Sequence, residues 1–166
     1  MSQPTITPRP ATDDDIAAVA RLEKAVATQP WSAGQFEDEL KTSKSTFLVL
    51  TDDETDEIVS GFIIFRELLG ETHILNVAVD TSQRRRGWGK RLLTLAINEA
   101  YRKGHDRVFL EVRINNAAAK ALYQVMGFQE VGRRKGFYSN GEDAIFMELR
   151  LKGALGEPEP GSNIYH

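Results

Sequence analysis

Apolar positions along the chain follow two spacings, and these predict strands and helices in alternation. Residues 46–50 and 57–67 are apolar runs of strand length on either side of an acidic turn, which indicates a hairpin. Residues 71–79 extend this pattern to three successive antiparallel strands. A short first strand is expected at Ile6, and the nearly continuous apolar run at 107–112 predicts another strand.

Helical spacing of apolar residues occurs in four segments, and the first two have recognisable starts. Thr12 with Asp15 and Ser32 with Gln35 have the spacing of a capping box, so a helix is expected after each pair. The residues expected to face inward in the first helix are Ile16, Val19, Ala20, Leu22 and Val26, and Phe36 and Leu40 form an i, i+4 pair in the second.

The other two helices are expected to end at glycines. One runs from about Lys90 to Lys103 and ends at Gly104, and the other lies within residues 115–128 and ends at Gly127. The residues that recur at helical spacing are Leu92, Leu93, Ala96, Ile97, Ala100 and Tyr101 in one, and Ala118, Ala121, Leu122 and Val125, expected to face inward, in the other.

The order of these elements predicts how the chain crosses the sheet. A strand, a helix and a second strand of these lengths form a right-handed crossover between parallel strands. The turn after residue 79 and Glu111 would then lie at the same end of the sheet, where open α/β sheets bind ligands. The last two strands are expected to join through Asn140-Gly141. Residues 1–152 are expected to form one domain and 153–166 a flexible C-terminal tail.

Composition narrows the class of protein. The chain has 166 residues, 41% hydrophobic and 27% charged, as in an ordinary soluble globular protein. No apolar run approaches the roughly 20 residues of a membrane span, and the N-terminus lacks an apolar signal core, so a cytoplasmic protein is expected. The sequence has no cysteine, which excludes disulfides and an enzyme thioester. Its three histidines are far apart, so no metal cofactor is expected.

Charge is concentrated locally rather than spread over the chain. The net charge is only −3, so no direct nucleic-acid partner is expected. Basic residues gather instead in a turn between a buried strand and a helix, together with Gly87 and Gly89. A helix start offers unpaired N–H groups and the positive end of the peptide dipoles, and glycine lets an anion approach them. This turn predicts a phosphate site, and the alternative is a solvated basic surface turn.

Two motifs carry a family resemblance. The pattern Arg84-x-x-Gly87-x-Gly89 after a strand ending in VAVD resembles the acetyl-coenzyme A signature of the GNAT acetyltransferases. Residues 109–128, with LEVR followed by NNAAAKALY, resemble the RimI branch, the ribosomal-protein-alanine N-acetyltransferases, and the later DAIFMEL fits that branch. The similarity implies a mixed α/β GNAT fold with a splayed central β-sheet of about seven strands, helices on both faces and acetyl-CoA between strands four and five.

The same resemblance implies roles for individual residues. By match to RimI-like enzymes, Glu111 would be the general base, Tyr123 the general acid and Asn116 a coenzyme A contact. Family members often have a Tyr-Tyr pair near the substrate where this chain has Phe137-Tyr138, which leaves Tyr138 as a candidate peptide contact. The backbone groups expected to pair with the acetyl-pantetheine arm are those of Val77, Ala78 and Val79. The residues expected around the pyrophosphate are Arg84, Arg85, Arg86, Gly87, Trp88, Gly89 and Lys90.

The residues themselves leave alternatives beside these roles. Glu111 is a carboxylate in an otherwise apolar run, which favours a partly desolvated base, but strand alternation alone could place it on a polar face. Tyr123 can protonate a leaving thiolate, since the reference pKa values are about 10 for Tyr and about 8.5 for a thiol, or it can be a core ring. Asn116 is a natural N-cap, and Trp31 is either a hydrophobic staple or part of a substrate groove.

The pKa of the substrate amine favours a protein N-terminus. An α-amine has a reference pKa of about 7.7–8.0 against about 10.4 for lysine, so a weak carboxylate base suits it better. We therefore predict acetylation of the N-terminal alanine of a small-subunit ribosomal protein by direct transfer, with the basic N-terminal peptide as partner. The rivals are another amine, such as lysine or a small molecule, and a non-catalytic acyl-CoA sensor. The pattern does not give the oligomeric state.

Overall fold

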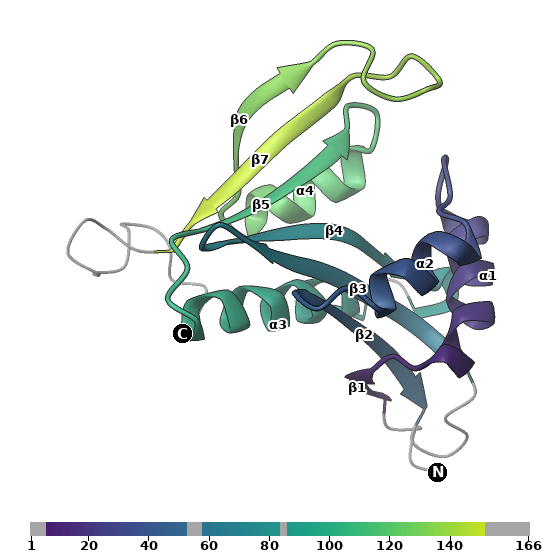
Figure 1. The fold of residues 1–166 in the computed structure, drawn as a ribbon. Coiled ribbons are helices and arrows are strands. Elements are labelled where there is room, and N and C mark those ends of the chain that lie inside the picture. Colours follow the sequence, from purple (N-terminus) through teal and green to yellow (C-terminus); the bar gives the residue numbers. More distant parts are fainter. Residues whose placement is uncertain (1–5, 53–57, 84–85, 152–166) are drawn as a thin grey trace. The chain divides into compact units, whose positions relative to one another are not determined.

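The computed structural model describes residues 6–52, 58–83 and 86–151. These residues contain four α-helices and a mixed sheet of seven strands in the order β1-β2-β3-β4-β5-β7-β6, which confirms the predicted mixed α/β fold (Figure 1). The chain forms two compact units: Met1–Arg66 with Asn76–Leu93, here the first unit, and Glu67–Leu75 with Thr94–His166, the second. The predicted tail at 153–166 lies outside the described residues, and the domain boundary stays a prediction.

The strands of the first unit follow the predicted hairpin pattern. β1, Ile6–Pro10, pairs antiparallel with β2, Ser45–Asp52, and β2 pairs antiparallel with β3, Val59–Leu68. The next strand in the sheet beside β3 is β4, which spans Glu71–Val79. A Cβ atom at Gly61 would lie only 2.9 Å from the carbonyl oxygen of Ala78, so only glycine fits there.

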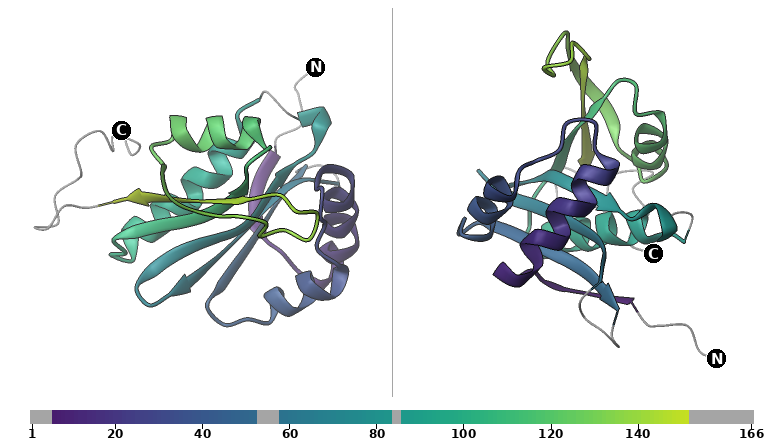
Figure 2. Two further views of the ribbon diagram at one scale, coloured as in Figure 1. Left: turned by 90° about the horizontal axis from the view of Figure 1, so that it is seen from above. Right: turned by 90° about the vertical axis from the view of Figure 1, so that its right-hand side faces the viewer.

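Both predicted capping boxes are confirmed in the first unit. The Thr12 N–H donates to Asp15 Oδ2 at 2.7 Å, and a short 3-10 turn at Asp13–Asp15 leads into α1, Ile16–Val26. α2, Ala33–Leu40, starts at Ser32, whose N–H donates to Gln35 Oε1 at 2.8 Å. The two helices contact each other, and α2 also contacts β2 (Figure 2).

An aromatic core lies beneath these two helices. Phe36 of α2 is fully buried and its ring lies 5.4 Å from that of Phe62 and 5.9 Å from that of Phe47, measured between centroids. The predicted inward face of α1 is also largely confirmed, because Ile16, Val19 and Leu22 are buried. The apolar spacing therefore located the core of this unit correctly.

The second unit confirms the predicted crossover. β5, Arg107–Arg113, pairs parallel with β4 at Thr72–Val108 and His73–Phe109. Its other neighbour is β7, Ala144–Arg150, which pairs antiparallel with both β5 and β6, Gln129–Arg134. α3 spans Trp88–Arg102, so it starts slightly earlier than predicted, and it ends before Gly104, where φ is +76°. Tyr101 is 40% exposed, whereas the other residues that recur at helical spacing in this helix are buried.

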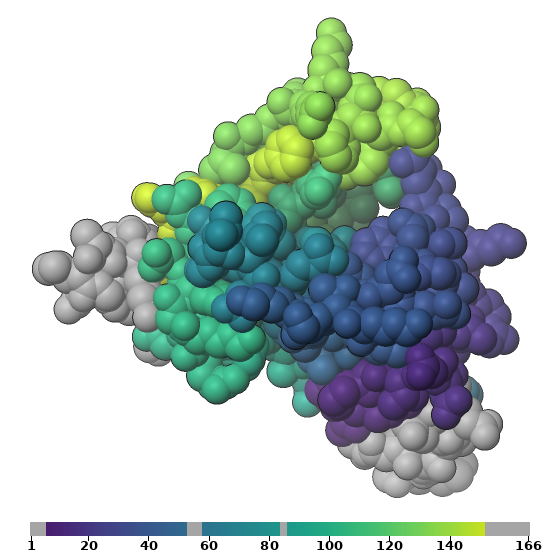
Figure 3. Space-filling model, in the orientation of Figure 1, coloured from purple at the N-terminus to yellow at the C-terminus, as the bar shows by residue number. Residues whose placement is uncertain are grey.

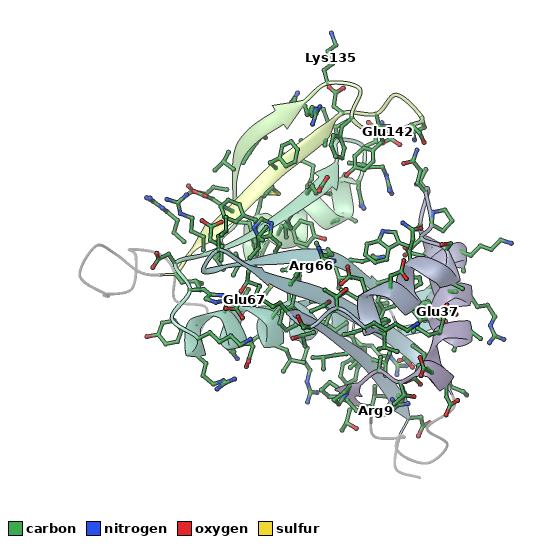
Figure 4. All side chains as sticks on the ribbon, in the orientation of Figure 1. Arg9, Glu37, Arg66, Glu67, Lys135 and Glu142 are labelled. Carbon is green, nitrogen blue, oxygen red and sulfur yellow. The ribbon has the colours of Figure 1, made fainter. Side chains whose placement is uncertain are left out.

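The turn between β6 and β7 has the predicted residues in a longer connection than a simple hairpin. The Gly141 N–H donates to the Tyr138 carbonyl oxygen at 2.9 Å, which closes a tight turn at Asn140-Gly141. The whole connection, however, runs from Lys135 to Asp143, and Lys135 points away from it (Figure 4). Figure 3 shows the surface of this hairpin open to solvent, in agreement with the exposure of most β6 residues.

The predicted inward face of α4, Ala117–Val125, is wrong. Ala118 and Ala121 are exposed, and Val125 is 75% exposed. Tyr123 and Met126 are buried instead. The helix is rotated because the larger Tyr and Met side chains gain more from leaving water than the small alanines do.

Candidate active site

The turn after β4 belongs to the first unit and is fixed by Asp80. Its N–H donates to the Ser60 carbonyl oxygen at 2.8 Å, and its Oδ1 accepts from the N–H and the hydroxyl of Ser82, both at 2.8 Å. A 3-10 turn at Thr81–Gln83 follows directly. Arg84 and Arg85, both predicted pyrophosphate contacts, lie outside the described residues.

α3 starts immediately beyond this turn, at a glycine. The Gly87 carbonyl oxygen accepts the Arg91 N–H at 3.0 Å, which is the first bond of the helix. The N–H groups of Trp88 and Gly89 precede that bond and are therefore oriented outward at the positive end of the helix. The exposed Arg86 and Lys90 add positive charge beside them. The donor set suits a phosphate group.

The structure shows a conformational reason for glycine at position 87, while its predicted contact with the pyrophosphate stays a prediction. Its φ is +79°, a left-handed conformation that other residues rarely adopt. A Cβ atom there would meet nothing within 4 Å, so the glycine is needed for the shape of the turn rather than for packing.

Trp88 contributes a further donor at this helix start. The Arg91 guanidinium carbon lies 5.1 Å from the centroid of its ring, within range of a cation–π contact. Its indole Nε1 is buried and has no hydrogen-bond partner among the described residues. A buried unpaired N–H is unusual in a folded protein, and an acceptor supplied by a ligand would satisfy it.

The predicted acyl-arm residues lie at the end of β4, still in the first unit. Ala78 is buried, while Val77 and Val79 are partly buried. The close approach of Gly61 to the Ala78 carbonyl fixes the position of this part of the strand. Gly61 was not among the residues that sequence reasoning selected, since a glycine inside a strand gives no functional signal of its own.

Trp31 packs as the predicted hydrophobic staple. It precedes the N-cap Ser32, and its ring lies 5.3 Å from that of Phe36. Its N–H donates at 3.1 Å to Glu23 Oε2, which also accepts from Asn76 Nδ2 at 2.7 Å. Glu23 is only 3% exposed, so this buried carboxylate joins α1, the segment before α2 and β4. Sequence reasoning missed Glu23 and Asn76, although a polar residue in an apolar strand was the available signal.

Glu111 lies in the second unit, on the open face of β5. Val108, Leu110 and Val112 are buried, and Glu111 alternates with them. It is directly opposite Phe146 of β7. Partial desolvation raises the pKa of its carboxyl group, and the positive charge of His73 opposes this effect. Strand alternation thus places Glu111 where solvent and substrate can reach it, and its surroundings make it a stronger base than an ordinary glutamate.

Tyr123 is a buried hydroxyl on α4. It is 8% exposed, and its ring lies 5.9 Å from that of Phe128. Burial, with a smaller effect from Tyr138, raises the pKa of Tyr123 to about 12. The side chain is therefore protonated at neutral pH and can act as a hydrogen donor.

Tyr138 interacts electrostatically with both Glu111 and Tyr123. Burial first, and then the negative charges of Glu111 and Glu142, raise its pKa, while Arg113 lowers it. The Arg113 guanidinium carbon lies 6.0 Å from the centroid of the Tyr138 ring. The Arg113 Nε atom is 3.8 Å from Glu142 Oε1, and both side chains are mostly buried.

Asn116 forms the predicted N-cap of α4. Its Oδ1 accepts the Ala119 N–H at 3.2 Å, and its own N–H donates to the Arg113 carbonyl oxygen at 2.9 Å. The cap uses the side-chain oxygen, so a ligand contact through Nδ2 is compatible with it. In the second unit, Glu111 therefore helps to raise the pKa of Tyr138, and Tyr138 helps to raise the pKa of Tyr123, so the three side chains are coupled in this order. Asn116 stands at the start of the helix that carries Tyr123.

Comparison with known proteins identifies the family. The model of the acetyltransferase (GNAT) family matches residues 16–128. A [ribosomal protein bS18]-alanine N-acetyltransferase from Salmonella typhimurium is 36% identical over 140 residues, which cover 82% of this chain and 92% of that protein. The crystal structure of the ribosomal-protein-S18-alanine N-acetyltransferase from Escherichia coli has a TM-score of 0.80 and 32% identity, and covers 98% of this chain and 100% of its own.

A second similar structure belongs to a protein complex. The crystal structure of the NatC complex bound to Gag peptide and CoA has a TM-score of 0.76 and 26% identity, and the similarity covers 89% of this chain and 99% of that one. Together these similarities confirm the resemblance to the ribosomal-protein-alanine N-acetyltransferases drawn from the two sequence motifs. The chain belongs to the acetyltransferase (GNAT) family.

Proposed function

We propose that this protein transfers the acetyl group of acetyl-CoA to the α-amine of an N-terminal alanine, and that its substrate is a small-subunit ribosomal protein. The observation that carries the proposal is the coupled group of Glu111, Tyr123 and Tyr138 in the second unit. The relatives that share this fold over most of their length are named for the same reaction.

The first unit supplies the groups proposed to bind acetyl-CoA. The N–H groups at the start of α3, with Arg86 and Lys90, would hold the pyrophosphate, and the predicted Arg84 and Arg85 would add charge. The Trp88 indole N–H is a further donor available to an oxygen of the co-substrate. The backbone of Val77, Ala78 and Val79 would pair with the pantetheine arm. Asn116, in the second unit, would contribute a coenzyme A contact through Nδ2.

The second unit supplies the groups proposed for the chemistry. Glu111 accepts a proton from the substrate ammonium, directly or through water, and the amine nitrogen then attacks the thioester carbonyl carbon. The carbon–sulfur bond breaks as the amide forms, and Tyr123 donates a hydrogen bond and a proton to the departing thiolate. The nitrogen loses its second proton as the amide forms, and this proton returns to Tyr123 through water, so each turnover releases one net proton. Tyr138 would contact the peptide. The reaction is a direct transfer, because the chain has no cysteine to carry an acyl group.

The raised pKa of Tyr123 limits how the thiolate leaves. A gap between about 12 and the reference thiol value of about 8.5 makes complete proton transfer cost roughly 5 kcal/mol. The same burial disfavours a charged thiolate beside Tyr123, which narrows that gap. Tyr123 therefore stabilises the leaving group chiefly by a strong hydrogen bond, with proton transfer completed as the thiolate separates.

The proposed substrate also implies where in the cell the enzyme works. An enzyme that modifies ribosomal proteins would act in the cytoplasm. No helix in the described ranges is long and apolar enough to cross a membrane.

Unacetylated small-subunit ribosomal proteins provide the test. They would be incubated with acetyl-CoA and either the wild-type protein or Glu111→Gln, and each would then be weighed intact and sequenced from its N-terminus by mass spectrometry. We expect one protein that begins with alanine to gain a single acetyl group at its α-amine, and to gain it only with the wild type. Acetylation of small amines without any ribosomal protein would contradict the proposal, as would acetyl-CoA binding without transfer.

A further inference from the structure

His73 lies beside Glu111 on the same face of the second unit. The parallel ladder sets His73 of β4 directly opposite Phe109 of β5, and their rings lie 5.2 Å apart between centroids. Side chains two residues apart on a strand project from the same face, at a spacing of about 6–7 Å. Phe109 and Glu111 have this relation, so Glu111 is the next side chain along β5 on the face that His73 contacts.

Two carboxylates act on His73, one on its own strand and one on β5. On its own strand, His73 Nε2 lies 3.7 Å from Glu71 Oε2, and both side chains are 35% exposed. On β5, the positive charge of His73 acts on Glu111 and lowers its pKa. The imidazole of His73 thus has two carboxylates nearby: Glu111, the proposed base, on β5, and the partly exposed Glu71 on its own strand.

The proposed reaction creates a need for such a group. Each turnover converts an ammonium and a thioester into an amide, a thiol and one proton, and this proton reaches Glu111 first. Glu111 cannot serve the next substrate until it has lost that proton. Imidazole, with a reference pKa of about 6.5, is the side chain that accepts and releases protons most readily near neutral pH.

We infer that His73 accepts the proton that Glu111 takes from the substrate amine and releases it to solvent beside Glu71. This inference rests on the proposed function of Glu111. In the step, protonated Glu111 returns to a carboxylate as neutral His73 becomes an imidazolium, and the imidazolium then loses the same proton to water. His73 acts through Glu111 and touches neither the acetyl group nor the amine, so it is a positioning residue rather than a catalytic one.

The first test measures the coupling without any substrate. The carboxyl group of Glu111 would be titrated by carbon NMR in the wild type, in His73→Phe and in Arg107→Gln. His73→Phe keeps a ring against Phe109 and removes the charge. Arg107→Gln is the control. Arg107 lies two residues from Phe109 on the same face of β5, as Glu111 does, but on the other side of Phe109, so this variant removes a positive charge that is farther from Glu111. We expect the pKa of Glu111 to rise in His73→Phe and to stay unchanged in Arg107→Gln.

The second test measures turnover with saturating acetyl-CoA and an alanine peptide. We expect kcat to fall roughly tenfold in His73→Phe, less than the contribution of the base itself, about 10²–10⁴-fold, because Glu111 is still present. The KM for acetyl-CoA should be unchanged, and the acidic limb of the pH profile should move to higher pH. Added imidazole should restore much of the rate of His73→Ala, because the site is partly exposed.

The outcomes separate this inference from the proposed function. Wild-type turnover in His73→Phe, or an unchanged titration of Glu111, would overturn the role of His73 while leaving the acetyltransferase intact. A rate loss in His73→Ala that imidazole does not restore would also overturn it, since that pattern indicates packing alone. If the wild type itself acetylated no peptide, the proposed function would fail, whatever the titration showed.

Discussion

α3 and α4 both follow a strand of the sheet, yet their N-termini are completed in opposite ways. α4 satisfies its own start, because Asn116 Oδ1 accepts the Ala119 N–H. α3 follows Gly87, which has no side chain to act as a cap, and the exposed Arg86 and Lys90 lie at its start. The Trp88 indole N–H there has no hydrogen-bond partner among the residues that the structure describes. A helix that caps itself needs no ligand at its start, whereas one that begins at a glycine leaves its N–H groups for an anion.

This contrast extends to function. The α3 start offers donors and positive charge, which suit binding of a phosphate-bearing co-substrate. The capped α4 carries the buried Tyr123, whose pKa is raised by burial and by Tyr138, which suits chemistry. Variants in the two regions should therefore produce different kinds of defect.

The largest effect is expected in the chemical region. Glu111→Gln should lower turnover by about 10²–10⁴-fold, the usual contribution of a positioned base, because glutamine cannot accept a proton. Acetyl-CoA affinity should stay within about twofold of the wild type, since the binding region is untouched. Calorimetric titration and a steady-state assay on one preparation measure both quantities. Near-normal turnover would remove Glu111 from the proposed role.

Alkaline pH should reveal the burial of Tyr123. Its pKa is raised to about 12 in the folded protein, so the folded state holds its proton more tightly than the unfolded state does. This contribution to the free energy of unfolding is fully present below about pH 10 and is lost as the pH rises towards 12, with a total of about 3 kcal/mol. Urea unfolding at pH 9 and at pH 11.5 should show a smaller loss for Tyr123→Phe than for the wild type. An equal loss of unfolding free energy in the wild type and in Tyr123→Phe would contradict the raised pKa of Tyr123.

The binding region should respond to bulk at the α3 start. Gly89→Val should weaken acetyl-CoA binding by roughly 10–100-fold, because β-branched methyl groups would hold the pyrophosphate away from the N–H groups. Gly34→Val is a matched control, since Gly34 is likewise the second residue of its helix, α2. Calorimetry should show normal affinity for the control. Unchanged affinity in Gly89→Val would place the phosphate site elsewhere.

The smallest effect is expected at the self-capped helix. Asn116→Ala should lower the free energy of unfolding by about 1 kcal/mol, the usual value of an N-cap, which thermal unfolding would detect. Asn116→Asp keeps an accepting oxygen and should restore stability. It lacks the Nδ2 donor, so acetyl-CoA affinity should remain reduced if Asn116 contacts the co-substrate. Normal affinity in Asn116→Asp would restrict this residue to capping.

Local sequence signals predicted much of this fold because the interactions behind them are themselves local. The capping boxes at Thr12 and Ser32, the staple formed by Trp31 and the cap at Asn116 each join residues within a few positions. The parallel pairing of β4 with β5 followed from the same kind of pattern, since a strand–helix–strand unit has one common handedness.

Signals that depend on contacts distant in sequence were missed or misjudged. Glu23 pairs with Asn76, and His73 with Phe109, across separations that no single-sequence pattern encodes. The inward face of α4 was wrong because apolar spacing gave alanines the same weight as Tyr123 and Met126. The roles of Glu111 and Tyr123 came from family resemblance, and their raised pKa values required the surrounding structure.

The central claim is that the enzyme acetylates an α-amine, and the position of the acetyl group tests it most directly. A short basic peptide that begins with alanine and contains an internal lysine would be incubated with acetyl-CoA and this protein, then fragmented in a mass spectrometer. We predict acetylation at the α-amine alone, because Glu111 is a weak base and an α-amine loses its proton far more readily than lysine does. Acetylation at the lysine would contradict the account, although the protein would remain a GNAT acetyltransferase.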